Sequence, residues 1–131
     1  MTTETLATIT LVVPAYDVGI AFYVGKLSFE LIEDAQLKNG KRWVVVGPVG
    51  GAKLLLAKAA DDAQAAAIGN QTGGRVSFFL ETDNFAETHA RFMAAGVEFL
   101  EEPRHEAYGT VAVFSDPFGN RWDLLERKET R

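Results

Sequence analysis

The sequence predicts an α+β fold made of two tandem βαβββ modules, residues 1–58 and 75–131, joined by a linker at residues 59–74. Two observations predict this arrangement. Segments of alternating apolar residues, typical of half-buried strands, follow the same order in both halves of the chain. Each half also has one helical segment between its first and second predicted strands. One helix covers only one face of a sheet, so we expect two curved mixed sheets to enclose a shared cavity.

The first module is predicted to begin with a strand and a short helix. Its predicted strands are residues 8–13, 29–37, 42–46 and 53–57. Asp17 is a candidate N-cap for the helix. The residues that we expect this helix to bury are Ile20, Ala21 and Val24. Between the second and third strands, Asn39-Gly40 indicates a two-residue hairpin turn, because both residue types tolerate positive φ.

The second module repeats this order after the linker. Its predicted strands are residues 75–81, 97–100, 110–114 and 120–125. Asp83 or Asn84 can cap a helix at about residues 85–95, and Gly96 is a stop signal at its end. The apolar and aromatic side chains at helical spacing are Phe85, His89, Phe92 and Met93. Asp116-Pro117-Phe118-Gly119 predicts the turn between the last two strands. In the linker, Asp61 or Asp62 can begin a short helix that Gly69 ends.

Composition limits the partners of this chain. Its net charge of −5 argues against nucleic acid or an anionic membrane as the main partner, since both require a basic surface. The absence of Cys excludes disulfides, thiol catalysis and Cys-ligated zinc. No apolar run approaches the length of a membrane-spanning helix, and no signal peptide is visible. The simplest expected location is the cytoplasm.

Three segments resemble the vicinal oxygen chelate superfamily, which includes glyoxalase I, extradiol dioxygenases and bleomycin-resistance proteins. They are TLVVPAYDVGIAFYVGKLSFE at 10–30, AAGVEFLEEP at 94–103 and YGTVAVFSDPFGNRWDLLE at 108–126. Ser28 stands where the family usually has Gly. The resemblance implies the glyoxalase/bleomycin-resistance fold and a small-molecule site in the cavity. It also implies a homodimer, often with modules paired across two chains.

The resemblance also implies a divalent metal, held by residues on the first and last strands of each module. Thr8 stands where the first ligand is expected, and Leu54 or Leu55 where the second is. Residues 74–80 offer no ligand in any register. Only Asp123 remains, where the family usually has Glu. One carboxylate does not hold a catalytic divalent cation well, so we expect no metal and no other cofactor.

Candidate site residues follow from the cavity that the resemblance implies. The expected ligand-binding residues are Thr8, Thr10, Trp43, Tyr108, Trp122 and Asp123. Asp123 and His105 are also candidate catalytic residues, because a carboxylate and an imidazole can move protons near neutral pH. The alternatives are an ion pair or solvent exposure for Asp123, a solvated loop for His105, and core packing for both tryptophans. Arginines can bind an anionic ligand, with surface ion pairing as the default.

The leading hypothesis for function is metal-independent binding or sequestration of a small molecule, as in bleomycin-resistance-like members of the family. The alternative is an enzyme of the superfamily, a lyase, isomerase or dioxygenase that uses Asp123 with atypical partners. A third hypothesis is an accessory domain that acts through protein contacts. The binding hypothesis predicts a sizeable apolar cavity and no turnover, whereas the enzyme predicts converging polar groups and loss of activity in Asp123→Asn.

Overall fold

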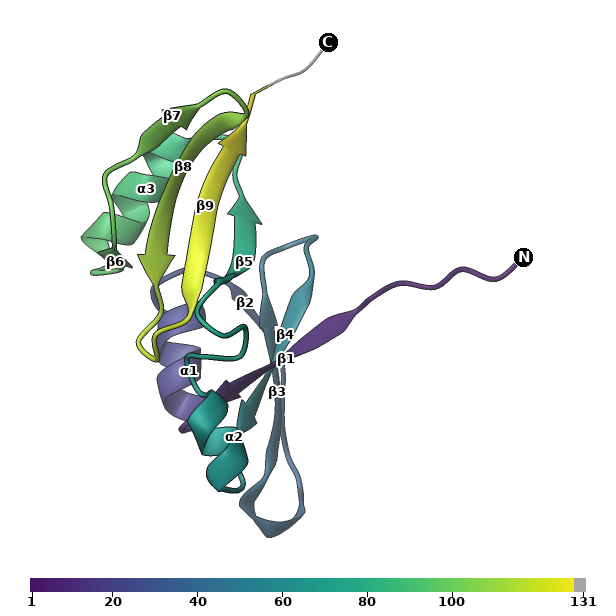
Figure 1. Cartoon of the computed structure of the whole chain (residues 1–131). Helices are drawn as coiled ribbons and strands as arrows, with labels where there is room; N and C mark the ends of the chain where they lie inside the picture. The colour runs from purple at the N-terminus through teal and green to yellow at the C-terminus, as the bar shows by residue number, and fades with distance from the viewer. Residues whose placement is uncertain (129–131) are drawn as a thin grey trace. The chain divides into compact units, whose positions relative to one another are not determined.

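A computed structural model describes residues 1–128 of the chain. Contacts divide the chain into two compact units between Ile68 and Gly69, so residues 59–68 belong to the first unit. Each unit contains one mixed β-sheet, and the predicted α+β class is confirmed (Figure 1). Within residues 1–128, no helix is long and apolar enough to cross a membrane.

The first unit contains a four-stranded sheet with the strand order β1-β4-β3-β2. Its strands are β1 (Thr8–Val13), β2 (Glu30–Gln36), β3 (Arg42–Gly47) and β4 (Lys53–Lys58). Its helices are α1 (Tyr16–Tyr23), the single 3₁₀ turn η1 (Lys38–Gly40) and α2 (Asp62–Ala67). β1 runs parallel to β4, and the other neighbouring pairs are antiparallel. Every strand predicted for this module is therefore present.

Helix α1 buries a different face from the one that the sequence predicts. It begins at Tyr16 with Ala15 as an N-cap that makes no side-chain hydrogen bond. Its buried residues are Gly19, Phe22 and Tyr23, so the prediction of Ile20, Ala21 and Val24 is wrong. A Cβ atom at Gly19 would lie 2.9 Å from the Leu56 side chain, which shows how closely the helix approaches the sheet there. The large aromatic side chains take the buried positions beside this contact.

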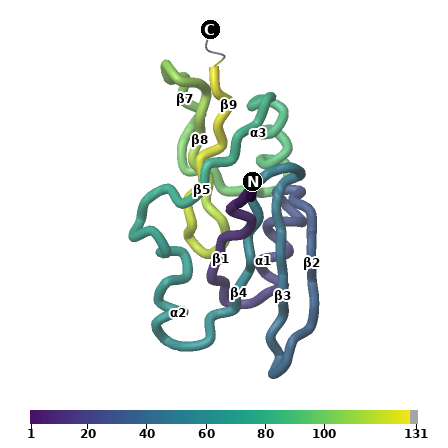
Figure 2. The backbone as a smooth tube through the Cα atoms, turned by 90° about the vertical axis from the view of Figure 1, so that its right-hand side faces the viewer, coloured from purple at the N-terminus to yellow at the C-terminus, as the bar shows by residue number. Residues whose placement is uncertain are grey.

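A turn forms at Asn39-Gly40 as predicted, but it is not the predicted two-residue hairpin turn. The Leu37 N–H donates to the Lys41 carbonyl at 2.7 Å, which leaves Lys38, Asn39 and Gly40 in the loop. Asn39 and Gly40 have positive φ, 62° and 77°, and the Lys41 N–H donates to the Lys38 carbonyl at 3.3 Å. The β2–β3 ladder continues to the pair Gln36 and Arg42, but the β3–β4 ladder covers only residues 44–46 and 54–56. Strands β3 and β4 therefore separate before the turn, and the β2–β3 hairpin reaches beyond β4 (Figures 1 and 2).

The first sheet has a face covered by α1 and an uncovered face. The fully buried face is lined by Leu11, Val13, Val44, Val46, Leu54 and Leu56. Side chains alternate along a strand, so the neighbours of these residues point to the other face. That uncovered face carries Thr8, Thr10, Trp43, Val45 and Leu55. The predicted ligand-binding residues of this module therefore share one face.

The second unit contains a sheet with the order β5-β9-β8-β6, and β7 pairs with β8 beside this path. Its strands are β5 (Val76–Glu81), β6 (Glu98–Phe99), β7 (Arg104–Glu106), β8 (Gly109–Ser115) and β9 (Arg121–Arg127). Up to residue 128, the one helix of this unit is α3 (Phe85–Ala94). β7 was not predicted from the sequence, so this module has one strand more than expected.

Helix α3 is capped by Asn84, whose side-chain oxygen accepts from the Glu87 N–H at 3.2 Å. Its buried residues are Phe85, Thr88 and Phe92, whereas Met93, which the sequence places at helical spacing with Phe85 and Phe92, is 54% exposed. Gly96 has a φ of 86°, as a helix stop signal requires. The helix packs on an aromatic core that contains Phe92, Phe114 and Trp122.

The turn between β8 and β9 is organised by a buried carboxylate. Asp116 Oδ1 accepts from the N–H groups of Phe118 and Asn120, each at 2.9 Å. Asp116 Oδ2 accepts from the Asn120 side-chain amide at 2.7 Å. Gly119 has a φ of 104°. The turn predicted at residues 116–119 is therefore present and fixes the register between β8 and β9.

Candidate functional site

Asp123 lies on the face of the second sheet that α3 does not cover. Its neighbour Trp122 stacks on Phe114 in the core under α3, so the alternation of β9 turns Asp123 to the opposite face. Asp123 pairs with Phe79 on β5 and with Val113 on β8. Phe79 is 62% exposed. A carboxylate therefore stands between an exposed aromatic side chain and an aliphatic one.

The Asp123 carboxylate is the least satisfied acidic group of this face. Its Oδ1 atom is buried and has no hydrogen-bond partner among the described residues. Burial raises the pKa of Asp123, the positive charge of Arg104 lowers it, and the negative charge of Glu101 raises it again. Folding thus removes water from this oxygen and gives it no donor in return, although such groups are normally paired.

Arg104 forms ion pairs with other charged groups of this face. It pairs with Val111 in the β7–β8 ladder, which places it on the same side as Asp123. Its guanidinium donates to Glu101 at 2.9 Å and to Glu106 at 2.5 Å. Hydrogen bonds with Glu101, with Glu106 and with Tyr108 raise the pKa of Arg104, so it stays cationic. The default expectation of ion pairing holds for this arginine.

His105 lies on the other side of the sheet from Asp123. Its Nδ1 atom is 3.3 Å from the Thr110 hydroxyl, and Thr110 shares its face with Ala112 and Phe114 on β8. That face is the one that carries the core under α3. The His105 side chain is exposed. The two candidate catalytic residues therefore do not meet.

Of the aromatic candidates in this unit, one lies at the site and one in the core. Trp122 is 4% exposed and packs between Phe78 and Phe114, with ring centroids 4.5 and 5.8 Å away. Trp122 is therefore a core residue, the alternative that the sequence left open, and it does not lie on the face that carries Asp123. Tyr108 is 51% exposed and contacts Arg104, so it belongs to the charged group on that face.

In the first unit, a pocket of about 510 Å³ opens where β3 and β4 separate. Trp43, 41% exposed, lines it together with Leu55 and Ala57. Thr8 and Thr10 lie on the same uncovered face, but they do not line the pocket. The structure thus brings Trp43, and not the two threonines, to the pocket of this unit.

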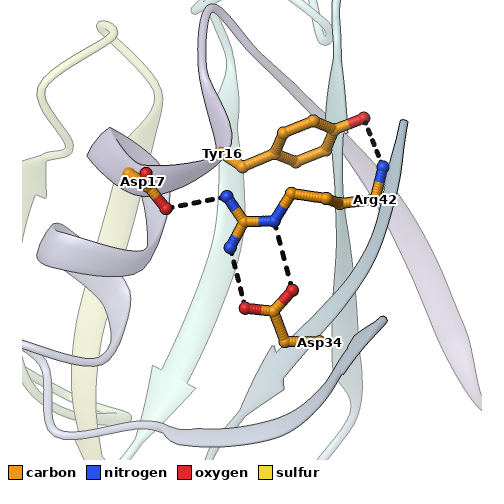
Figure 3. A network of polar contacts seen from close by, with 4 residues as sticks. All are labelled: Tyr16, Asp17, Asp34 and Arg42. Atoms are coloured by element: carbon orange, nitrogen blue, oxygen red, sulfur yellow. Dashed lines mark hydrogen bonds and ion pairs between the residues drawn. The ribbon is translucent and has the colours of Figure 1, made fainter. Parts of the chain in front are cut away.

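Arg42 lines this pocket and is held by a network of polar contacts with Tyr16, Asp17 and Asp34, which Figure 3 shows. The guanidinium donates to both oxygens of Asp34, at 3.2 and 2.7 Å, and to Asp17 on α1 at 2.8 Å. The Arg42 N–H donates to the Tyr16 hydroxyl at 3.2 Å, and the guanidinium lies over the Tyr16 ring. The hydrogen bond from Arg42 lowers the pKa of Asp34. This network joins the β2–β3 hairpin to α1.

The donor set does not fit the divalent metal that the resemblance implies. At the expected ligand positions, Thr8 offers a hydroxyl, Leu55 an alkyl group and residues 76–80 neither carboxylate nor imidazole. Asp123 is the one suitable ligand, and the positive charge beside it belongs to Arg104. In the part of the chain that the structure describes, no group of three or more His, Cys, Asp or Glu is arranged to hold a metal.

Sequence reasoning missed the residues that surround the candidates. Glu101 was not singled out, although its Oε2 atom accepts from the Val113 N–H at 2.9 Å and its Oε1 atom holds Arg104. Phe79 is likewise absent from the predicted site residues, although it is 62% exposed beside Asp123. The alternation of side chains along a strand could have identified Phe79. Residues 79 and 123 lie on adjacent strands, and each follows an aromatic residue that faces the core.

Two mixed sheets, each with a helix on one face, define a two-module α+β protein of the glyoxalase/bleomycin-resistance type. The chain belongs to the Glyoxalase/Bleomycin resistance protein/Dioxygenase superfamily, whose model matches residues 5–124. It is 51% identical over 126 residues to an uncharacterized protein of Shewanella frigidimarina (strain NCIMB 400), covering 94% of this chain and 93% of the relative.

Two solved structures of similar length share this fold. UcmS2 is 30% identical with a TM-score of 0.81, and the match covers 95% of this chain and 98% of UcmS2. TnmS3, an antibiotic binding protein from Streptomyces sp. CB03234, is 26% identical with a TM-score of 0.77. That match covers 98% of this chain and 99% of TnmS3. The chain is thus similar over nearly its whole length to a protein that binds an antibiotic.

Proposed function

We propose that this protein binds a small molecule reversibly and without a metal, and that the ligand presents a hydrogen-bond donor or a cationic group to Asp123. The observation that carries the proposal is the buried Asp123 Oδ1 atom, which has no partner within residues 1–128. The exposed ring of Phe79 lies beside it on the neighbouring strand. A ligand with an apolar ring and an adjacent amine or hydroxyl group matches both features.

The energetics favour such a ligand. An unsatisfied buried acceptor costs about 1–3 kcal/mol, and a hydrogen bond to a charged group contributes about 1.5–3 kcal/mol. A donor from the ligand recovers this loss at Asp123, whereas an anion meets electrostatic repulsion there. Contact with Phe79 adds burial of apolar area. The antibiotic-binding activity of TnmS3, a relative at 26% identity, supports binding rather than turnover.

Isothermal titration calorimetry with three matched probes tests the proposal. We expect 1-naphthylmethylamine, which is cationic at pH 7.5, to bind more tightly than 1-naphthalenemethanol, and 1-naphthoate to bind more weakly than both at this site. Asp123→Asn should weaken amine binding at least about tenfold, as loss of a charge-assisted hydrogen bond predicts. Asp83→Asn, at an exposed position of the same unit, is the matched control. Equal amine affinity in wild type and Asp123→Asn would refute the proposal.

Metal independence has its own test. Protein purified without chelators and without a metal-affinity tag should contain substoichiometric Ni, Zn, Mn and Fe by elemental analysis. Amine binding should be unchanged after dialysis against EDTA. A stoichiometric metal, or loss of binding that an added metal restores, contradicts this part of the proposal.

An enzymatic role is the second candidate, because burial raises the pKa of Asp123 and a carboxyl group that gains and loses a proton can act as a general acid or base. Such a role would use Asp123 with Arg104 as an electrostatic partner, since His105 faces away. Its test is turnover of an amine- or hydroxyl-bearing ligand once one is found. Turnover that is lost in Asp123→Asn favours the enzyme, and stoichiometric binding without product favours sequestration.

We also propose that the protein is a homodimer. Each unit also carries large exposed apolar residues outside the two proposed ligand sites, such as Ile9 in the first unit and Leu100 in the second. Where exposed apolar residues form a contiguous patch, they mark a protein–protein contact surface. Light scattering after size-exclusion chromatography should give twice the chain mass of 14.3 kDa. The chain mass itself at micromolar concentration would contradict this.

A further inference from the structure

We propose that the pocket between the diverging ends of β3 and β4, here called the strand notch, is a separate binding site for a planar aromatic anion. The inference goes beyond the proposed function, because it concerns other residues and the opposite ligand charge. The residues that line the strand notch include Trp43, Leu55, Ala57, Lys41, Lys58 and Gln64, all within the first unit.

The notch exists because two ladders of the sheet end at different places. β3 stays paired with β2 as far as Arg42, and β4 stays paired with β1 as far as Lys58. Between β3 and β4 themselves, pairing ends at Val44 and Leu56. The space of about 510 Å³ lies within the usual range for small-molecule pockets.

Two aromatic residues, Tyr16 and Trp43, line the notch beside aliphatic residues. Trp43 lies on the face of the sheet that α1 does not cover, so it is not part of the core under the helix, and it is 41% exposed. Leu55 and Ala57 lie on the same face of β4. An indole beside aliphatic side chains favours a flat ring that can stack on it.

The charge of the notch is positive in an otherwise acidic chain. Arg42 is paired with both Asp17 and Asp34, so these three side chains together carry a net charge of −1. Lys41 and Lys58 also line the notch, and among residues 1–128 neither forms an ion pair. The chain as a whole has a net charge of −5, so this local excess of cations is not an average property of its surface. An anionic group on the ligand complements it.

Both sides of the notch are held in place by hydrogen bonds. On one side, the Tyr16 hydroxyl accepts from the Arg42 N–H, which lies beyond the end of the β3–β4 ladder. On the other, Gln64 Oε1 accepts from the Ala60 N–H at 2.7 Å, and Asp61 caps α2 through the Gln64 N–H at 2.8 Å. A pocket whose walls are fixed before binding loses less conformational entropy when a ligand enters.

Two fluorescent probes test the inference. 8-Anilinonaphthalene-1-sulfonate carries the anion, and N-phenyl-1-naphthylamine is its uncharged analogue. We expect saturable one-to-one binding of the sulfonate, weaker binding of the analogue, and loss of affinity for the sulfonate at high salt. Lys41→Gln/Lys58→Gln should weaken sulfonate binding about tenfold and leave analogue binding unchanged. Lys26→Gln/Lys128→Gln, two exposed lysines outside the notch, is the matched control.

The location is read from the two indole N–H signals in a ¹H–¹⁵N spectrum. The sulfonate should shift the Trp43 signal and leave the signal of the buried Trp122 in place. Trp43→Phe should retain the fold and reduce energy transfer from tryptophan to the probe to the part that Trp122 contributes. The inference is overturned if the lysine pair changes neither affinity, if the analogue binds as tightly as the sulfonate, or if only Trp122 responds. Because Asp123 takes no part in this experiment, its outcome is independent of the amine titration.

Discussion

Asp123 and His105 lie on opposite faces of the second sheet. Asp123 pairs with Val113 and Phe79 on the uncovered face, while His105 contacts Thr110 on the face that carries the core under α3. Within one chain, the strand register therefore keeps these two side chains from acting together on one substrate molecule. What remains at Asp123 is a partly buried carboxylate beside Arg104, and this arrangement has measurable consequences for stability.

Asp123→Asn should stabilise the protein at pH 7. The folded-state pKa of Asp123 is raised, chiefly by burial, so between the unfolded and folded pKa values the folded chain binds more protons than the unfolded chain. The free energy of unfolding therefore falls as the pH rises through that window, and removing the charge removes this loss. Thermal unfolding at several pH values should show a higher melting temperature for the variant at pH 7 and a shrinking difference toward pH 4. The prediction is contradicted if the variant has a lower melting temperature than wild type at pH 7 and the same melting temperature at pH 4.

Ser28→Gly should stabilise the fold by up to about 1 kcal/mol. Ser28 has a φ of 63°, in the left-handed region that costs a non-glycine residue about 1–2 kcal/mol, and the greater freedom of Gly in the unfolded chain offsets part of the gain. The measurement is the urea midpoint at constant slope. Ser28→Ala, which keeps a Cβ atom, should show no gain. Equal midpoints for the Gly and Ala variants would mean that φ at this position is not under strain.

Asp116→Ala should destabilise the protein by about 2–4 kcal/mol, because it removes the acceptor of three hydrogen bonds and leaves buried donors at Asn120 unpaired. Asp116→Asn keeps one acceptor oxygen and should lie between wild type and the Ala variant. Chemical denaturation measures both. A loss below about 0.5 kcal/mol in the Ala variant, the level of an ordinary surface change, would show that the turn does not depend on this carboxylate.

Arg42→Lys should lower the melting temperature by a few degrees, because Lys cannot donate to both oxygens of Asp34 and to Asp17 together. The hydrogen bond from Arg42 lowers the folded pKa of Asp34, so its stabilising effect is present above the unfolded pKa and is lost as the pH falls through the folded pKa. The difference between wild type and variant should therefore disappear in acid. Arg121→Lys, at an exposed position, is the control. A difference that persists unchanged at low pH would point to packing on Tyr16 instead.

The sequence predicts most of the fold, because strand alternation and turn chemistry are local. Asn39-Gly40 and Asp116-Pro117-Phe118-Gly119 both form turns at the expected positions. The buried face of α1 could not be read in the same way, since Gly19 adds nothing to an apolar pattern yet marks the contact with Leu56. β7 has three polar residues and no alternation, so nothing local distinguishes it from a loop.

The candidate site was less predictable, because it depends on contacts between strands. Period two already places Trp122 and Asp123 on opposite faces, and this signal separates the core residue from the site residue. Asp123 Oδ1 is buried without a hydrogen-bond donor because none of the neighbouring donors in the described part of the chain contacts it. Such an outcome depends on the three-dimensional structure. Arg104 is adjacent in space but is held by Glu101 and Glu106, and no sequence spacing reports that competition.

The most direct test of the central claim is the ¹³C signal of the Asp123 carboxyl carbon during titration with 1-naphthylmethylamine. We predict that this signal shifts in step with saturation and that the pKa of Asp123 falls toward its ordinary value in the complex, because the bound cation favours the ionised carboxylate. Binding that leaves the Asp123 signal and its pKa unchanged would contradict the claim that this carboxylate receives the ligand.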